Sequence, residues 1–215
     1  MTLPLPLRNR LADLVLDALH DGDARRGLEA LAAVCADPRA LDATTSPLSF
    51  PAELFDRGPD GWRLKPGYRE HAAPFAERAT RAAHALADRP LAPPDPPLET
   101  VLDQATTLFA AGLYFEVHEI LEPHWMHAEG ATRQALQGLI QAAVGYQHLA
   151  NGNLGGARAL LHDGAAKLVG QRLAGRDLDA FAREVAVHAR ELAAGGEETA
   201  RAFDWRRVPS FPAEA

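Results

Sequence analysis

The fold follows from one stretch of the sequence, in which residues 109–125 read FAAGLYFEVHEILEPHW, residues 136–143 read LQGLIQAA and residues 148–153 read HLANGN. Apolar residues recur in it at spacings of three and four, which is the repeat of one face of a helix. Gly112 and Asn151-Gly152 interrupt that repeat, and glycine favours the left-handed turn that ends a helix. We therefore expect two helical hairpins stacked on each other.

The same repeat extends on both sides of this stretch, so residues 97–195 are predicted to form a helical bundle. Asn153 is expected to cap one of its helices, and Asp177 to cap a last helix that ends at residues 194–196. Pro123 lacks the amide hydrogen that would bond to the carbonyl of Glu119, so it should kink its helix or end the regular part. Residues 196–215 carry aromatic side chains and are expected to dock as a C-terminal tail.

The first ninety residues predict a smaller helical part. Two apolar stripes separated by Asp21-Gly22-Asp23 indicate a helical hairpin, and a third helix is expected over residues 68–88. The turn-forming residues 57–60 lie between two short alternating segments, which predicts a small β-hairpin with a winged-helix-like alternative for the whole part. Residues 91–97 are rich in proline and are interpreted as a linker. The chain is therefore expected to be mainly α.

Composition limits the class of protein. The chain has 215 residues, 47% of them apolar, and a formal net charge of −7. This predicts a globular protein and makes nucleic acid an improbable partner, because nucleic-acid binding needs a basic surface. One cysteine provides neither a disulfide nor a zinc framework. No signal-peptide pattern opens the chain and no run approaches the roughly 18 apolar residues of a membrane span, so a soluble cytoplasmic protein is expected.

Helical phase selects a set of candidate site residues in the central stretch. His118, Glu119 and Glu122 fall on stripes shared with large apolar residues, and we expect these three side chains to be turned inward. Glu116 falls on another side of the same helix and is expected to be solvated. The remaining members of the predicted polar cluster are Trp125, Gln137, Gln141 and His148.

The cluster has two interpretations. Two carboxylates one helical turn apart in a dry place need compensation, which a divalent ion such as zinc, manganese or iron provides. Glu119 and Glu122 with His118 or His148 would then hold the ion, although the HExxE spacing differs from the HExxH of zinc proteases. In the other interpretation the carboxylates accept hydrogen bonds from glutamines, Arg133 or the indole of the cluster, and the network fixes the register of the helices.

Small and polar residues elsewhere add two expectations. Gly138 and Gly145 lie inside a predicted helix, where glycine costs roughly 1 kcal/mol against alanine, so they are expected to permit a close approach by another helix or a ligand. His188 shares a stripe with apolar residues and is interpreted as a core imidazole with a hydrogen-bond partner.

Three ordered blocks of the central stretch carry a resemblance to a known family. They are residues 109–125 with their Gly, Tyr-Phe-Glu, His-Glu, Leu-Glu and Trp positions, residues 136–141, and residues 148–157. Over residues 100–170 the chain resembles the bacterial family known as domain of unknown function 309. The resemblance implies a compact all-helical domain without an assigned activity, whose recurrent polar residues correspond here to His118, Glu119, Glu122, Trp125 and Gln137 or Gln141.

Three hypotheses for function follow. The first is a non-enzymatic helical protein, structural or binding a small ligand or partner, with a homo-oligomer formed through its apolar or glycine-lined helix faces. The second is a metal-dependent hydrolase-like enzyme that uses the His118, Glu119 and Glu122 cluster. The third is an N-terminal half that binds duplex DNA. The sequence favours the non-enzymatic hypothesis.

Overall fold

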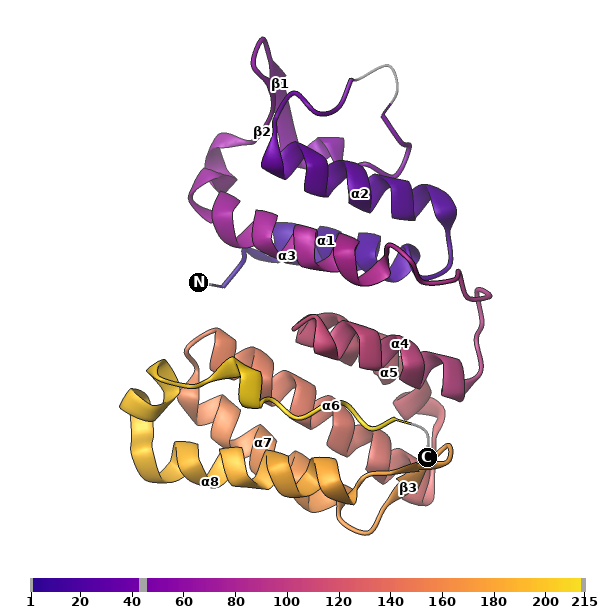
Figure 1. Ribbon diagram of the computed structural model, residues 1–215, viewed down its shortest axis with the longest axis vertical. Coiled ribbons are helices and arrows are strands. Elements are labelled where there is room, and N and C mark those ends of the chain that lie inside the picture. The colour runs from indigo at the N-terminus through magenta and orange to yellow at the C-terminus, as the bar shows by residue number, and fades with distance from the viewer. Residues whose placement is uncertain (1, 43–45, 214–215) are drawn as a thin grey trace. The chain divides into compact units, whose positions relative to one another are not determined.

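The structure is a computed structural model that describes residues 2–42 and 46–213. The chain divides into two compact units, Met1–Pro96 and Pro97–Ala215. Helices dominate both units, and one short antiparallel hairpin lies in the first (Figure 1). The mainly α class and the N-terminal β-hairpin that the sequence predicted are thus confirmed.

The first unit is built on three helices, and α2 packs against the other two. The helices are α1 (Leu5–Asp17), α2 (Gly22–Ala36) and α3 (Ala72–Leu86), with a short 3-10 turn over Pro66–His71 before α3. The side chain of Asp21 caps α2 by accepting a hydrogen bond from the amide of Ala24 at 2.7 Å. The predicted break between the first two helices therefore lies at the expected residues.

The hairpin of the first unit pairs β1 (Phe55–Gly58) with β2 (Gly61–Leu64), and a second short 3-10 turn, Ala52–Leu54, precedes it. Phe55 lies opposite Leu64 and Gly58 opposite Gly61, so that Pro59 and Asp60 form the turn. The pair at the end of the ladder away from the turn is buried, since Phe55 and Leu64 are each 7% exposed.

The second unit is a run of five helices in which each packs on the next, from α4 to α8 (Figure 1). They are α4 (Leu98–Ala110), α5 (Tyr114–His127), α6 (Gly130–Ala150), α7 (Leu154–Leu168) and α8 (Asp179–Arg201). Gly112 and Gly152 have φ of +68° and +75°, as the turns between helices require. The side chain of Asn153 caps α7 by accepting from the amide of Gly156 at 3.0 Å.

Aromatic rings fill the centre of this unit. Phe109 lies at the middle of the cluster, with four rings whose centroids are 5.1 to 5.8 Å from its own, and most of these pairs meet edge to face. The four rings belong to Tyr114, Tyr146, Phe181 and Phe211. Because Phe211 comes from the segment after α8, the end of the chain contributes to this core.

Helices α6 and α7 pack closely through glycines. A Cβ atom added at Gly138 would lie 2.7 Å from the side chain of Leu168, and one added at Gly145 would lie 2.8 Å from that of Leu161. Gly164 on α7 faces the backbone of α6, since a Cβ there would lie 2.9 Å from the carbonyl oxygen of Gly138. The expectation that these helical glycines permit close approach by another helix is confirmed.

A second hairpin, β3 (Arg172–Leu173) with β4 (Arg176–Asp177), was not predicted from the sequence. Its turn residues Ala174 and Gly175 have φ of +45° and +77°, the signs of a type I′ turn. The strands have two residues each and the turn lacks the usual Asn or Asp, which is why the pattern gave no signal. Arg176 is 2% exposed and donates to the carbonyl of Pro212 and to Asp103, each at 2.8 Å. The hairpin therefore ties α4 to the end of the chain.

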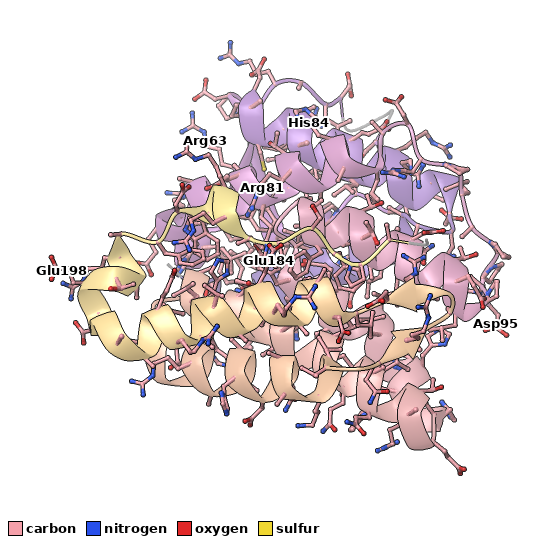
Figure 2. The ribbon with its side chains drawn as sticks, turned by 60° about the horizontal axis from the view of Figure 1, so that its bottom comes forward. Arg63, Arg81, His84, Asp95, Glu184 and Glu198 are labelled. Atoms are coloured by element: carbon pink, nitrogen blue, oxygen red, sulfur yellow. The ribbon has the colours of Figure 1, made fainter. Side chains whose placement is uncertain are left out.

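Two predictions concerned where helices α8 and α5 are interrupted. The break predicted at residues 194–196 is present in α8, because Gly196 leaves the helical conformation, with φ +62° and ψ −147°, and a further helical stretch then follows to Arg201. Figure 2 shows Glu198 on the turn after this break. Of the two outcomes expected at Pro123, a kink or the end of the regular helix, the second is wrong, because α5 continues to His127.

Among the helices of residues 2–42 and 46–213, none combines the length and the hydropathy needed to cross a bilayer.

Candidate functional site

The side chains of His118, Glu119 and Glu122 converge on the surface of α5. Each offers one possible ligand atom, and these three atoms all lie within 4.8 Å of one another. The Nδ1 atom of His118 is 3.0 Å from a carboxylate oxygen of Glu119, and its Nε2 atom is 3.6 Å from one of Glu122. Two adjacent positions and one a helical turn later bring the three groups together, because residues four apart lie on the same side of a helix.

This cluster, hereafter the His-Glu-Glu cluster, is open to solvent. The side chains of His118, Glu119 and Glu122 are 25%, 34% and 41% exposed. The expectation that they are turned into the core was therefore wrong. The buried face of α5 is instead centred on Val117 and Leu121, both fully covered. The cluster flanks that face, where water and ions reach it.

The prediction for Glu116 was wrong in the opposite sense, because this residue is buried. It was expected to be solvated, and it is 0% exposed. Large apolar residues occur on every side of α5, so the spacing of apolar positions did not fix which side is covered. Phe115 is only partly covered, and Met126 is 56% exposed.

The predicted hydrogen-bond network around the cluster does not form in the part of the chain that the structure describes. Arg133 stacks on the ring of Trp125 at 4.4 Å and donates to the carbonyl of Trp125 at 2.9 Å, so it caps the end of α5. The indole nitrogen of Trp125 and the side-chain oxygen of Gln141 are buried without a hydrogen-bond partner in residues 2–42 and 46–213. Gln137 is half-buried on α6.

His148 does not contribute an atom to the group formed by His118, Glu119 and Glu122. It lies near the end of α6, and its Nδ1 atom accepts a hydrogen bond from the side-chain nitrogen (Nδ2) of Asn153 at 2.9 Å. This contact supports the cap of α7, because the same Asn153 side chain accepts from Gly156. Of the two histidines proposed from the sequence as metal ligands, the geometry thus favours His118.

A second polar pair lies in the core of the same unit. The hydroxyl of Tyr146 is 2.8 Å from Nδ1 of His188, and both residues are almost completely buried. Burial raises the pKa of Tyr146, with further increases from Tyr114 and Glu184, so the tyrosine keeps its proton and donates. Burial also lowers the pKa of His188, and Arg207 adds to this effect against the opposing charges of Glu191 and Glu184. The expected core imidazole with a partner is confirmed.

Comparison with known proteins identifies one family, over part of the second unit. Residues 102–160 match the model of the family described as Domain of unknown function (DUF309). The match runs from α4 into α7 and contains the whole of α5, and it confirms the resemblance that the three sequence blocks indicated. No curated protein and no solved structure matches the chain.

Proposed function

We propose that the second unit binds a divalent transition-metal ion through His118, Glu119 and Glu122. The observation that carries the proposal is the convergence of three ligand atoms within 4.8 Å on one helix. Two carboxylates supply the charge that a divalent ion needs, and a mixed oxygen and imidazole set suits zinc, manganese or iron(II).

The contacts of the cluster support this proposal over a purely structural role. In the described part of the chain, the polar partners of these three side chains are one another, and all three lie on α5. A set that fixed the register of two helices would instead bond across to α6, as the sequence hypothesis required. Exposed ion pairs of this kind contribute only about 0–1 kcal/mol to stability. The convergence of the three side chains therefore adds little to the stability of the fold.

A hydrolytic role is the second candidate, and the number of ligands favours it. Structural zinc sites are closed by four protein ligands, whereas catalytic sites have three and an open position. The His-Glu-Glu cluster has three possible ligand atoms, and its side chains are 25–41% exposed. Water and a substrate therefore have access to an ion bound there. When bound, such an ion supplies Lewis-acid chemistry to a substrate oxygen.

Isothermal titration of the untagged full chain with zinc and with manganese tests the proposal. One ion is expected to bind per chain, and the His118→Ala variant is expected to lose affinity by about 100-fold or more, because a ligand contributes at least as much as the groups that orient it. His124→Ala is the matched control, since it removes an imidazole from the same helix outside the cluster. Equal affinities for wild type and His118→Ala would overturn the proposal.

A further inference from the structure

The first unit contains a pocket of about 310 Å³ that is separate from the His-Glu-Glu cluster. It lies between the end of α2, the β1–β2 hairpin and the start of α3, and its volume is at the lower end of the range for small-molecule sites. It is lined by Val34, Cys35, Pro38, Phe55, Trp62, Arg63, Leu64, Arg69, Ala72 and Ala76.

The hairpin wall of this pocket is held in place by backbone contacts. Gly61 has φ of +95°, and any side chain at this position would collide with the carbonyl of Pro38. The absence of a side chain lets the next residue, Trp62, donate its amide to that carbonyl at 2.8 Å. The indole of Trp62 also donates to the carbonyl of Leu41 at 3.1 Å. The first bond fixes the backbone of Trp62 and the second fixes its ring before any ligand binds.

The floor of the pocket is apolar and packed. Phe55, Leu64 and Val34 are each at most 7% exposed. The ring of Phe50 lies behind the wall, with centroids 5.5 Å from Phe55 and 5.2 Å from Trp62. A space lined in this way favours the hydrocarbon or aromatic body of a ligand, because its burial removes apolar surface from water.

The charged residues that line the pocket are both arginines. Arg63 on β2 and Arg69 before α3 line the pocket, and none of its ten lining residues, all within the described part of the chain, is acidic. Arg69 uses its Nε to donate to the carbonyl of Leu64 at 3.4 Å. Arg63 is 3.5 Å from Asp60, an exposed contact, and its side chain projects from the ribbon in Figure 2. Guanidinium groups bind carboxylates through paired hydrogen bonds.

We propose that this pocket binds a small organic acid whose carboxylate is held by Arg63 and Arg69 and whose aromatic or short hydrocarbon body lies against Trp62. The site is distinct in place and chemistry from the metal site. A ligand in it covers Cys35, which also lines the pocket.

Cys35 provides the means of testing the site, because it is the single cysteine of the chain. Burial raises the pKa of its thiol to about 11, so alkylation at neutral pH is slow and its rate reports access to the pocket. The indole N–H of Trp62 provides a second reporter, since its NMR cross-peak is identified by its loss in a Trp62→Phe variant.

The experiment compares phenylbutyrate with phenylbutanol, a neutral probe with a similar body. Phenylbutyrate is expected to slow alkylation of Cys35 by N-ethylmaleimide, followed by intact mass, and to shift the Trp62 indole cross-peak with saturation. Phenylbutanol is expected to bind about tenfold more weakly or worse, because it cannot make charge-assisted hydrogen bonds.

Variants separate the pocket from the rest of the surface. The double variant Arg63→Gln, Arg69→Gln is expected to reduce phenylbutyrate affinity by about tenfold or more, and Ala76→Phe is expected to abolish binding by filling the space. Arg26→Gln is the matched control, because Arg26 is an exposed arginine that does not line the pocket. The proposal is overturned if phenylbutyrate moves neither reporter, if phenylbutanol binds equally well, or if Arg26→Gln weakens binding as much as the double variant does.

Discussion

Substitution of Gly164 by alanine should destabilise the second unit, although alanine is the better helix former. A Cβ at this position would lie 2.9 Å from the carbonyl oxygen of Gly138 and 3.0 Å from the amide nitrogen of Ala142. Both atoms belong to the backbone of α6, so neither rotates away. Overpacking of this kind costs about 3 kcal/mol at the upper end of its range, against a gain of roughly 1 kcal/mol in helix propensity. The net loss is therefore about 2 kcal/mol.

Urea unfolding followed by far-UV circular dichroism measures this loss. With a slope of about 2 kcal/mol per molar urea, the midpoint for the second unit should fall by roughly 1 M. Gly155→Ala is the matched control on the same helix, because a Cβ there has its nearest contact at 3.9 Å, and this variant should be within about 0.5 kcal/mol of wild type or more stable. If Gly164→Ala is as stable as wild type, the close backbone packing of α6 and α7 is not as described.

Three further perturbations follow from the packing of the second unit. Arg176→Met should lower the free energy of unfolding in urea by about 3 kcal/mol, because it removes the buried guanidinium that donates to Asp103 and to the carbonyl of Pro212. A loss of less than about 0.5 kcal/mol, as for a surface substitution, would contradict the role given to the β3–β4 hairpin. Ala174→Asn should stabilise by about 0.5–1 kcal/mol, since asparagine tolerates the positive φ that Ala174 adopts, and an unchanged thermal midpoint would count against this turn geometry. Because the pKa of His188 is lowered in the folded protein, the unfolded chain takes up a proton more readily than the folded chain does. The contribution of His188 to stability is therefore present above pH 6.5, the ordinary pKa of histidine, and is lost as the pH falls below it. Urea midpoints across that range should show a smaller pH dependence in His188→Gln than in wild type, and identical profiles would refute the assignment.

Most of the helical architecture could be predicted because local chemistry and long-range packing agree there. The breaks at Gly112 and Gly152 have the positive φ that glycine supplies, and Asn153 caps α7 with its own side chain. The β3–β4 hairpin could not be predicted, since its strands are too short to show alternation. The break at Gly196 was predicted, but the helical stretch that follows it to Arg201 was not, because a glycine that breaks a helix does not prevent another turn from following it.

The residue types in the sequence identified the candidate site, but the spacing of apolar residues along α5 assigned its side chains to the wrong face of the helix. His118, Glu119 and Glu122 do converge, but they lie beside the buried face of α5 rather than on it, and Glu116 takes the buried position. The apolar pattern of α5 continues around the helix, so sequence alone left several faces equivalent. The pocket at Trp62 depends on the hairpin meeting the end of α2, a contact between segments more than twenty residues apart for which the sequence contains no pattern.

Anomalous X-ray scattering at the zinc absorption edge, from crystals of the untagged full chain grown with zinc, tests the central claim most directly. A bound zinc ion is expected to give an anomalous peak at about 2.0–2.2 Å from a ring nitrogen of His118 and from carboxylate oxygens of Glu119 and Glu122. Ordered density for these three side chains with no anomalous peak between them would contradict it.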